Sequence, residues 1–233
     1  MSALRSTAAR VGEIVAVFVP AAVVLVFAWP GASYDPATWQ ATVWGANVLM
    51  LGVVWAGLRL RGQGWAHLGL RRWPGPRGAL ATVLRSLVAL LVGLLGFGVG
   101  AVVGGALLGV PEGADMSGYD YFAGDLPLFL LVLVAVWIVS SFGEEVIYRG
   151  FLITRLAELW GGSRTALWCA VVAAGVIFGL VHFTWGVVGI LETALMGIGL
   201  GAVYVKLGRS LWVTILAHAY MDTLLMVQLY LAG

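Results

Sequence analysis

Residues 127–153 read PLFLLVLVAVWIVSSFGEEVIYRGFLI, and this stretch decides the fold because it combines two conflicting properties. It is long and apolar enough to cross a bilayer, which takes about 20 helical residues. It also carries two adjacent carboxylates, Glu144 and Glu145, followed by Arg149. An ionisable side chain at bilayer depth costs about 3 kcal/mol or more unless it is paired or hydrated. Such a cluster inside a spanning helix therefore indicates function more than packing.

The composition of the whole chain is that of a membrane protein. Of its 233 residues, 61% are hydrophobic and 10% are charged, whereas soluble domains carry roughly 25% charged residues. The 33 glycines and 11 tryptophans agree, since spanning helices tolerate Gly and Trp favours the headgroup interface. Cys169 is the single cysteine, which excludes internal disulfides and cysteine-cluster metal sites and leaves it a packing role.

Seven apolar stretches predict an all-α, polytopic membrane helix bundle. We expect spans near 11–29, 38–58, 79–108, 127–153, 165–184, 187–205 and 210–231. The third span is long and rich in glycine, which predicts a tilted helix packed closely against a neighbour. No soluble domain or internal repeat is visible, so residues 1–233 are expected to form a single membrane domain. Residues 1–126 would hold the first three spans, and 127–233 the functional core.

Cationic residues predict how the bundle lies in the membrane. The loops at one end carry no Lys or Arg but hold Asp35, Glu112, Asp115, Asp120 and Asp125. All 13 Lys and Arg belong to the other end, and they are Arg5, Arg10, Arg59, Arg61, Arg71, Arg72, Arg77, Arg85, Arg149, Arg155, Arg164, Lys206 and Arg209. Because cytoplasmic loops are enriched in Lys and Arg, we expect a cytoplasmic N-terminus and an outward C-terminus.

Two basic segments leave alternatives open. Arg5 and Arg10, with the apolar residues 14–28, could form a signal peptide, although Glu13 interrupts that pattern. The basic cytoplasmic loop 59–78 is predicted to lie along the anionic lipid surface. Its side chains suited to that interface are Trp65, Leu68, Leu70 and Trp73. Nucleic-acid binding is a remote second interpretation of the same charges, and no nucleic-acid partner is expected.

The fourth predicted span presents its charged residues on two faces. Residues i and i+4 of a helix are neighbours on its surface, so Glu145 is expected to pair with Arg149. Glu144 points about 100° away, toward the face that carries Tyr148. An intramembrane Glu–Arg pair is often structural, which leaves Glu144 as the carboxylate available for chemistry.

Two later segments supply imidazoles at a compatible depth. They are Phe178-Gly-Leu-Val-His182 on the fifth predicted span and His218-Ala-Tyr-Met-Asp222 on the seventh. Counted at about 1.5 Å per residue, Glu144 and His182 lie at matching height in a helical hairpin. A lone histidine on an apolar helix usually packs through a hydrogen bond, but two histidines, a free carboxylate and Asp222 together indicate a site.

Two other features of the predicted sixth span have simpler interpretations. Glu192 could line the same cavity or could form an interhelical hydrogen bond. Gly197, Gly199 and Gly201 predict a close-packing helix face more than a phosphate-binding loop, because no strand precedes them.

Three short motifs occur in order on separate predicted helices. They are EExxxR at 144–149, FxxxH at 178–182 and HxxxD at 218–222. This ordered set resembles the CAAX-protease and bacteriocin-processing family of intramembrane proteases, which is related to the Rce1-like and ABI-like groups. The resemblance covers the segment from Glu144 to Asp222, and it implies a multi-span membrane protein that hydrolyses a peptide bond.

The resemblance also implies a role for each motif residue. Glu144 and His182 would activate a water molecule against a peptide carbonyl. His218 and Asp222 would stabilise the oxyanion that forms, and a preorganised donor at that position is worth roughly 3–4 kcal/mol. The residues expected to orient this group are Glu145, Arg149 and Phe178.

The role of Asp222 stays open, because the third motif of the family carries Asn or Asp. An ionised Asp only accepts hydrogen bonds, whereas Asn could donate to an oxyanion. Asp222 could instead be protonated, or it could orient His218 and make the imidazole the donor. In a zinc version, Glu144, His182 and His218 would ligate Zn²⁺, with Asp222 behind them. We expect the metal-free mechanism without a cofactor, because nothing in the spacing requires a metal.

These features predict an intramembrane endopeptidase that cleaves a peptide or a membrane-associated protein in a cavity open toward the cytoplasm. The Arg-, Ala-, Gly- and Trp-rich composition suggests a bacterial plasma or inner membrane. One alternative is a proton-coupled transporter, although its usual repeats and interrupted helices are not visible. Another is a scaffold or immunity protein that keeps the motif residues for structure. The expected partners are the substrate and the lipid bilayer.

Overall fold

The computed structural model describes residues 6–28, 35–108 and 116–232, and every regular element within them is helical. The long uninterrupted α-helices are α1 (Thr7–Ala28), α2 (Pro36–Leu60), α3 (Pro76–Leu108), α6 (Arg164–Leu180), α7 (Gly186–Lys206) and α8 (Leu211–Ala232). A further continuous rod is composed of α4 (Leu126–Ala135), the π-helical segments η5 (Val136–Phe142) and η6 (Glu145–Leu152), and α5 (Ile153–Leu159). Short 3₁₀ helices are η3 (Trp65–Leu68), η4 (Ser117–Phe122) and η7 (Phe183–Trp185).

Six helices within the described residues are long and apolar enough to cross a membrane. The predicted all-α polytopic bundle is therefore confirmed, and the chain is an integral membrane protein. One predicted span, 165–184, is shorter than expected, because α6 has 17 residues and ends at Leu180. The rod predicted over 127–153 instead continues to Leu159. Which terminus faces the cytoplasm stays a prediction.

Local sequence signals place the helix ends. α2 begins where the Asp35 carboxylate accepts a hydrogen bond from the Thr38 backbone N–H at 2.8 Å, with Pro36 in the first turn. α4 begins in the same way, because Asp125 accepts a hydrogen bond from the Leu128 N–H at 3.0 Å. Carboxylates cap helix N-termini by satisfying N–H groups that lack a partner within the helix. Asp35 and Asp125 thus have a local structural role at this end of the molecule.

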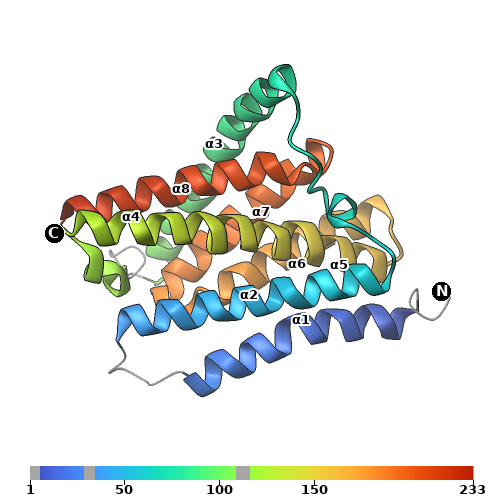
Figure 1. The fold of residues 1–233 in the computed structure, drawn as a ribbon, viewed down its shortest axis with the longest axis horizontal. Helices are drawn as coiled ribbons and strands as arrows, with labels where there is room; N and C mark the ends of the chain where they lie inside the picture. The colour runs from blue at the N-terminus through green and yellow to red at the C-terminus, as the bar shows by residue number, and fades with distance from the viewer. Residues whose placement is uncertain (1–5, 29–34, 109–115, 233) are drawn as a thin grey trace.

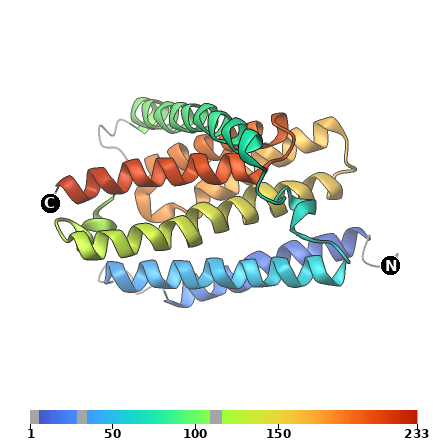
Figure 2. The ribbon, with the colours of Figure 1, turned by 45° about the horizontal axis from the view of Figure 1, so that its top comes forward.

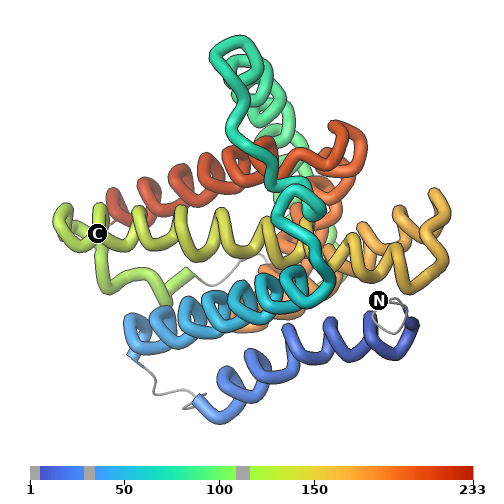
Figure 3. The backbone as a smooth tube through the Cα atoms, turned by 45° about the vertical axis from the view of Figure 1, so that its right-hand side comes forward, coloured from blue at the N-terminus to red at the C-terminus, as the bar shows by residue number. Residues whose placement is uncertain are grey.

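The helices form an elongated bundle in which α1 begins and α8 ends on opposite sides. α1 packs along α2, while α8 lies beside the α4–α5 rod (Figure 1). α7 packs between α6 and α3, and α3 runs obliquely across α7 and α8 (Figure 2). The first turns of α3 project away from the bundle (Figure 3). The tilt predicted for the third span is therefore observed.

Glycines let α7 approach both of its neighbours closely. A Cβ added to Gly96 of α3 would lie 2.7 Å from the carbonyl oxygen of Leu195 on α7. On the other side of α7, a Cβ added to Gly197 would lie 3.1 Å from the Cα of Gly175 on α6. Small residues allow helix backbones to pack this closely inside a membrane. Both glycine-rich faces predicted to pack closely do so.

We expect Gly100→Ala to lower the melting temperature of the purified protein in detergent. A Cβ at this position would overlap the backbone of Glu192 on α7, and overpacking a close contact costs about 1–3 kcal/mol. Gly98→Ala is the matched control on the same helix, because nothing lies within 4 Å of its added Cβ. Equal melting temperatures for the two variants would contradict close packing of α3 on α7.

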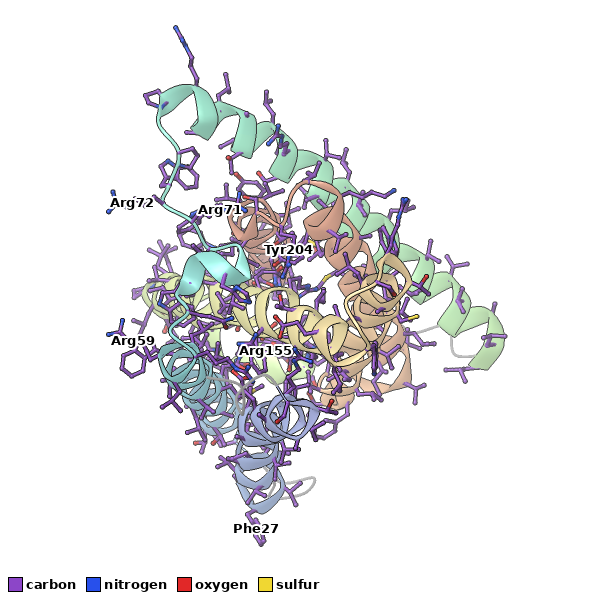
Figure 4. The ribbon with its side chains drawn as sticks, turned by 90° about the vertical axis from the view of Figure 1, so that its right-hand side faces the viewer. Phe27, Arg59, Arg71, Arg72, Arg155 and Tyr204 are labelled. Carbon is purple, nitrogen blue, oxygen red and sulfur yellow. The ribbon has the colours of Figure 1, made fainter. Side chains whose placement is uncertain are left out.

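The end that carries the arginines holds a buried ion cluster, and Figure 4 faces this end with Arg155 labelled. Arg155 is fully buried on α5, with its Nε 3.0 Å from the Glu13 carboxylate of α1. Its guanidinium also donates to the Gln63 side-chain oxygen at 2.9 Å. Arg61, at the end of α2, reaches the same Glu13 carboxylate at 2.6 Å. These contacts hold α1, α2 and α5 together at one end of the bundle.

The arginine-rich loop between α2 and α3 packs partly on protein. Leu68 is fully buried, and its carbonyl accepts a hydrogen bond from the Tyr204 hydroxyl at 2.8 Å. The Leu68 side chain therefore does not face the lipid interface as predicted, because this part of the loop covers the ends of α7 and α8. That the loop 59–78 as a whole lies along the lipid surface stays a prediction. Arg59 and Arg72 remain exposed and extend outward from this end (Figure 4).

Candidate active site

Glu144 lies on the α4–α5 rod, between the two π-helical segments η5 and η6. In π-helical turns the backbone hydrogen bonds run from i to i+5, and such turns are often found at functional sites. The Glu144 side chain is nearly buried, and its Oε1 accepts a hydrogen bond from Asn47 Nδ2 of α2 at 3.3 Å. No pattern in the sequence predicts the π-helical turns or the contact with Asn47.

Glu145 faces different partners from its neighbour. Its Oε1 lies 2.8 Å from Arg149 Nη1 and 2.9 Å from His218 Nδ1 of α8. Glu145 is 0% exposed, and Arg149 and His218 are also buried. The predicted Glu145–Arg149 pair is present, and it also reaches an imidazole that the sequence assigned to another motif. The divergence expected between the two adjacent carboxylates is therefore observed.

Phe178 is the central aromatic ring of the site. The Arg149 guanidinium carbon lies 4.3 Å from the centroid of the Phe178 ring, a cation–π contact. The ring centroid lies 4.7 Å from that of His182 and 6.1 Å from that of His218. Because Phe178 is almost fully buried, it fixes the relative positions of both imidazoles. The predicted contact between Phe178 and His182 is present.

His182 lies just beyond α6, whereas the sequence placed it inside a span over 165–184. Its Nδ1 lies 2.7 Å from the Phe178 carbonyl oxygen, one of the last carbonyls of α6. Carbonyls in the last turn of a helix lack a partner within the helix, so this contact helps to end it. If Nδ1 donates to the carbonyl, Nε2 is left as a hydrogen-bond acceptor.

Asp222 is held by a residue that the sequence did not predict. Ser141 Oγ donates to Asp222 Oδ2 at 2.6 Å, while Asp222 Oδ1 lies 3.7 Å from His218 Nε2. A carboxylate that accepts from Ser141 on one oxygen and faces an imidazole with the other is suited to orienting His218. This geometry favours the second of the roles considered for Asp222. The only signal for Ser141 is a polar side chain in an apolar span.

One cavity of about 530 Å³ brings the predicted catalytic residues together. Its walls include Glu144, His182, His218 and Asp222, which come from three parts of the chain. Tyr148 also lines it, on the face that the sequence predicted for Glu144. Glu192 was considered as a further lining residue, but α7 contributes Thr193 and Met196 to the cavity, and Glu192 packs at the contact with α3.

Two further aromatic rings, those of Tyr119 and Trp185, continue the ring contacts outward from His182. The Tyr119 ring, from η4, lies 6.2 Å from the Trp185 ring, and Trp185 lies 4.8 Å from His182. Tyr119 also lines the cavity. Burial raises the pKa of the Tyr119 phenol, and the negative charges of Asp222 and Glu144 act in the same direction. Tyr119 therefore stays protonated and can donate a hydrogen bond toward the cavity.

The cavity extends toward the end without arginines. It is lined by Pro36 and Gln40 at the start of α2, by Ser117 of η4, and by Gln228 near the end of α8. The sequence predicted both a cytoplasmic arginine-bearing end and a cavity open toward the cytoplasm. Since the two lie at opposite ends of the fold, these expectations cannot both hold.

The zinc version of the site finds little support in the geometry. Among the described residues, no group of three His, Cys, Asp or Glu side chains is arranged to hold a metal ion. Both ring nitrogens of His218 face carboxylates, with Nδ1 on Glu145 and Nε2 toward Asp222.

Residues 126–224 match the family model described as Type II CAAX prenyl endopeptidase Rce1-like. The matched segment runs from α4 into α8 and contains all three motifs and Ser141, but not the site residues Asn47 and Tyr119. The resemblance seen in the sequence is thus confirmed over this segment, and it implies an intramembrane protease. Comparisons with curated proteins and with solved structures gave no match.

The two adjacent glutamates should differ in their effect on stability. Glu145→Gln leaves the buried Arg149 charge without its carboxylate, and breaking a buried pair costs about 3–5 kcal/mol. Glu144→Gln removes no ion pair within 4 Å and should cost less than about 1 kcal/mol. Thermal unfolding of the two purified variants measures the difference. Equal losses would show that the two carboxylates have the same structural role.

Proposed function

We propose that this protein is an intramembrane endopeptidase in which Glu144 and His182 activate water to hydrolyse a peptide bond. Its substrate would be a peptide or a membrane-associated protein. The observation that carries the proposal is the shared cavity, which contains the carboxylate of Glu144, both imidazoles and Asp222. Titratable side chains within a membrane-spanning bundle cost free energy of folding, so several of them around one cavity indicate a functional site.

The neighbouring side chains support Glu144 as the general base. Glu145 is held by Arg149 and His218, so its carboxylate is not available to a substrate. Glu144 has one hydrogen bond from Asn47 and otherwise faces the cavity. His182 can accept a second hydrogen bond from the same water through Nε2. A general base in this position typically contributes about 10²–10⁴-fold to the rate.

His218 is suited to stabilise the oxyanion. Its Nδ1 is directed at Glu145, which fixes the ring, and its Nε2 lies on the cavity side near Asp222. A proton on Nε2, favoured by the Asp222 carboxylate, would be donated to the substrate oxygen as negative charge develops. Preorganised donors of this kind lower the barrier most where water is excluded.

The proposed reaction has two steps. In the first, Glu144 takes a proton from water, the oxygen adds to the carbonyl carbon, and the oxyanion accepts the hydrogen bond from His218. In the second, the carbon–nitrogen bond breaks and Glu144 returns the proton to the departing amine. One water molecule is consumed, and no oxidant, reductant or bound group is required.

Incubation of the purified protein in detergent with a peptide library, with and without a strong chelator, tests the proposal. Glu144→Ala and His182→Ala should each reduce cleavage by about 10²–10⁴-fold without loss of the folded state. Lys206→Gln, at the exposed last residue of α7, is the control and should cleave at the unaltered rate. Mass spectrometry of the products measures each rate.

Three outcomes would count against this mechanism. Cleavage retained in Glu144→Ala and His182→Ala would remove these residues from the reaction. Cleavage abolished by the chelator would favour the zinc version. No cleavage of any peptide, with a cellular phenotype retained in Glu144→Gln, would favour the scaffold or immunity protein.

A further inference from the structure

Apart from Arg149 in the site and Arg85 within α3, the Lys and Arg residues of the described fold lie at one end of the bundle. The Lys and Arg side chains in its loops and turns lie at the N-terminal ends of α1, α3, α6 and α8 and at the C-terminal ends of α2, α5 and α7. Several of them are visible together when the molecule is viewed from this end (Figure 4). By the positive-inside rule this end faces the cytoplasm.

The cavity runs from the middle of the bundle, where Glu144, Tyr148 and His218 line it, toward the end opposite the arginines. On α1 its walls run from Phe18 to Leu25, in the C-terminal half of that helix. On α2 they run from Pro36 to Met50, nearest its N-terminus. On α8 they run from His218 to Leu229. Every one of these stretches leads from the middle of the bundle away from the arginines.

Packed protein closes the bundle on the arginine side of the site. Val54 and Leu58 of α2 and Phe151 of η6 are at most 1% exposed. Beyond them lies the buried cluster of Arg155, Glu13 and Arg61. A peptide could not reach Glu144 from this end without separating α1, α2 and α5. At the other end the cavity walls include the polar side chains of Gln40 and Gln228, and exposed Asp35 immediately precedes the lining residue Pro36.

We propose that the substrate reaches the site from the extracytoplasmic side of the membrane. The substrate would then be an exported peptide or the outward-facing segment of a membrane protein, bound in an extended form between α1, α2 and α8. That it is a substrate rests on the proposed function. The direction of access rests only on the position of the cavity and the distribution of charge.

Single-cysteine labelling tests the direction of access. Cys169→Ser removes the native thiol, and Leu225→Cys then places a thiol in the cavity wall of α8. Val227→Cys is the matched control on the same helix, because Val227 is exposed but does not line the cavity. Lys206→Cys reports the arginine-bearing end. A membrane-impermeant quaternary ammonium maleimide is applied to intact cells that produce the full chain and to permeabilised cells.

The proposal predicts that Leu225→Cys is labelled in intact cells, about tenfold or more above Val227→Cys, because only a hydrated thiol forms the reactive thiolate. Lys206→Cys should be labelled only after permeabilisation. Gln228→Cys, at the rim of the cavity, should behave like Leu225→Cys and serves if the latter does not fold. The same labelling is expected with Glu144→Gln, so an inactive protein would not affect the result.

Two results would overturn the proposal. In the first, both cavity thiols are labelled only after permeabilisation, which would place the opening on the cytoplasmic side. In the second, neither cavity thiol is labelled in either preparation while Lys206→Cys is labelled after permeabilisation, which would show a cavity closed to water. Neither result depends on whether the protein cleaves peptides.

Discussion

The buried contact of Glu145 with both Arg149 and His218 is the interaction on which the site depends. One carboxylate oxygen lies within 3 Å of a nitrogen of each partner, in a part of the bundle without exposure to solvent. A buried charge is tolerable only when it is paired, so these three residues constrain one another. Arg149 in turn lies over Phe178, which contacts both imidazoles. Through this series of contacts, a single ion pair sets the positions of the groups that line the cavity.

This arrangement lets two adjacent residues of the same type do different work. The Glu145 carboxylate is bound to Arg149 and thereby holds the site together, whereas the Glu144 carboxylate lines the cavity. The separation depends on the local backbone as well as on sequence spacing, because π-helical turns flank Glu144 on both sides. The same bundle separates charge along its length, with the arginines at one end and the cavity toward the other. The residues that set the orientation of the protein in the membrane are therefore separate from the residues that line its cavity.

Much of this fold could be predicted from the sequence, because hydropathy and helix length are set by the bilayer. The motif pairs were also predictable, since residues four apart in a helix are neighbours, as with Glu145 and Arg149. The contacts of Ser141 with Asp222 and of Asn47 with Glu144 could not be predicted, because they join helices that no local sequence pattern connects. The position of His182 beyond the end of α6 could not be predicted either, because it depends on a contact between the imidazole and a backbone carbonyl. The direction of the cavity required the packing of α1, α2 and α8 to be known.

A double-mutant cycle measures directly whether Glu145 and Arg149 act as one unit. The free energy of unfolding would be determined for the unaltered protein, Glu145→Gln, Arg149→Met and the double variant. We expect a coupling energy of about 1–3 kcal/mol, with the double variant less destabilised than the sum of the single changes, because removing both charges leaves neither unpaired. Additive losses would contradict it, since they would mean that the two side chains are held independently.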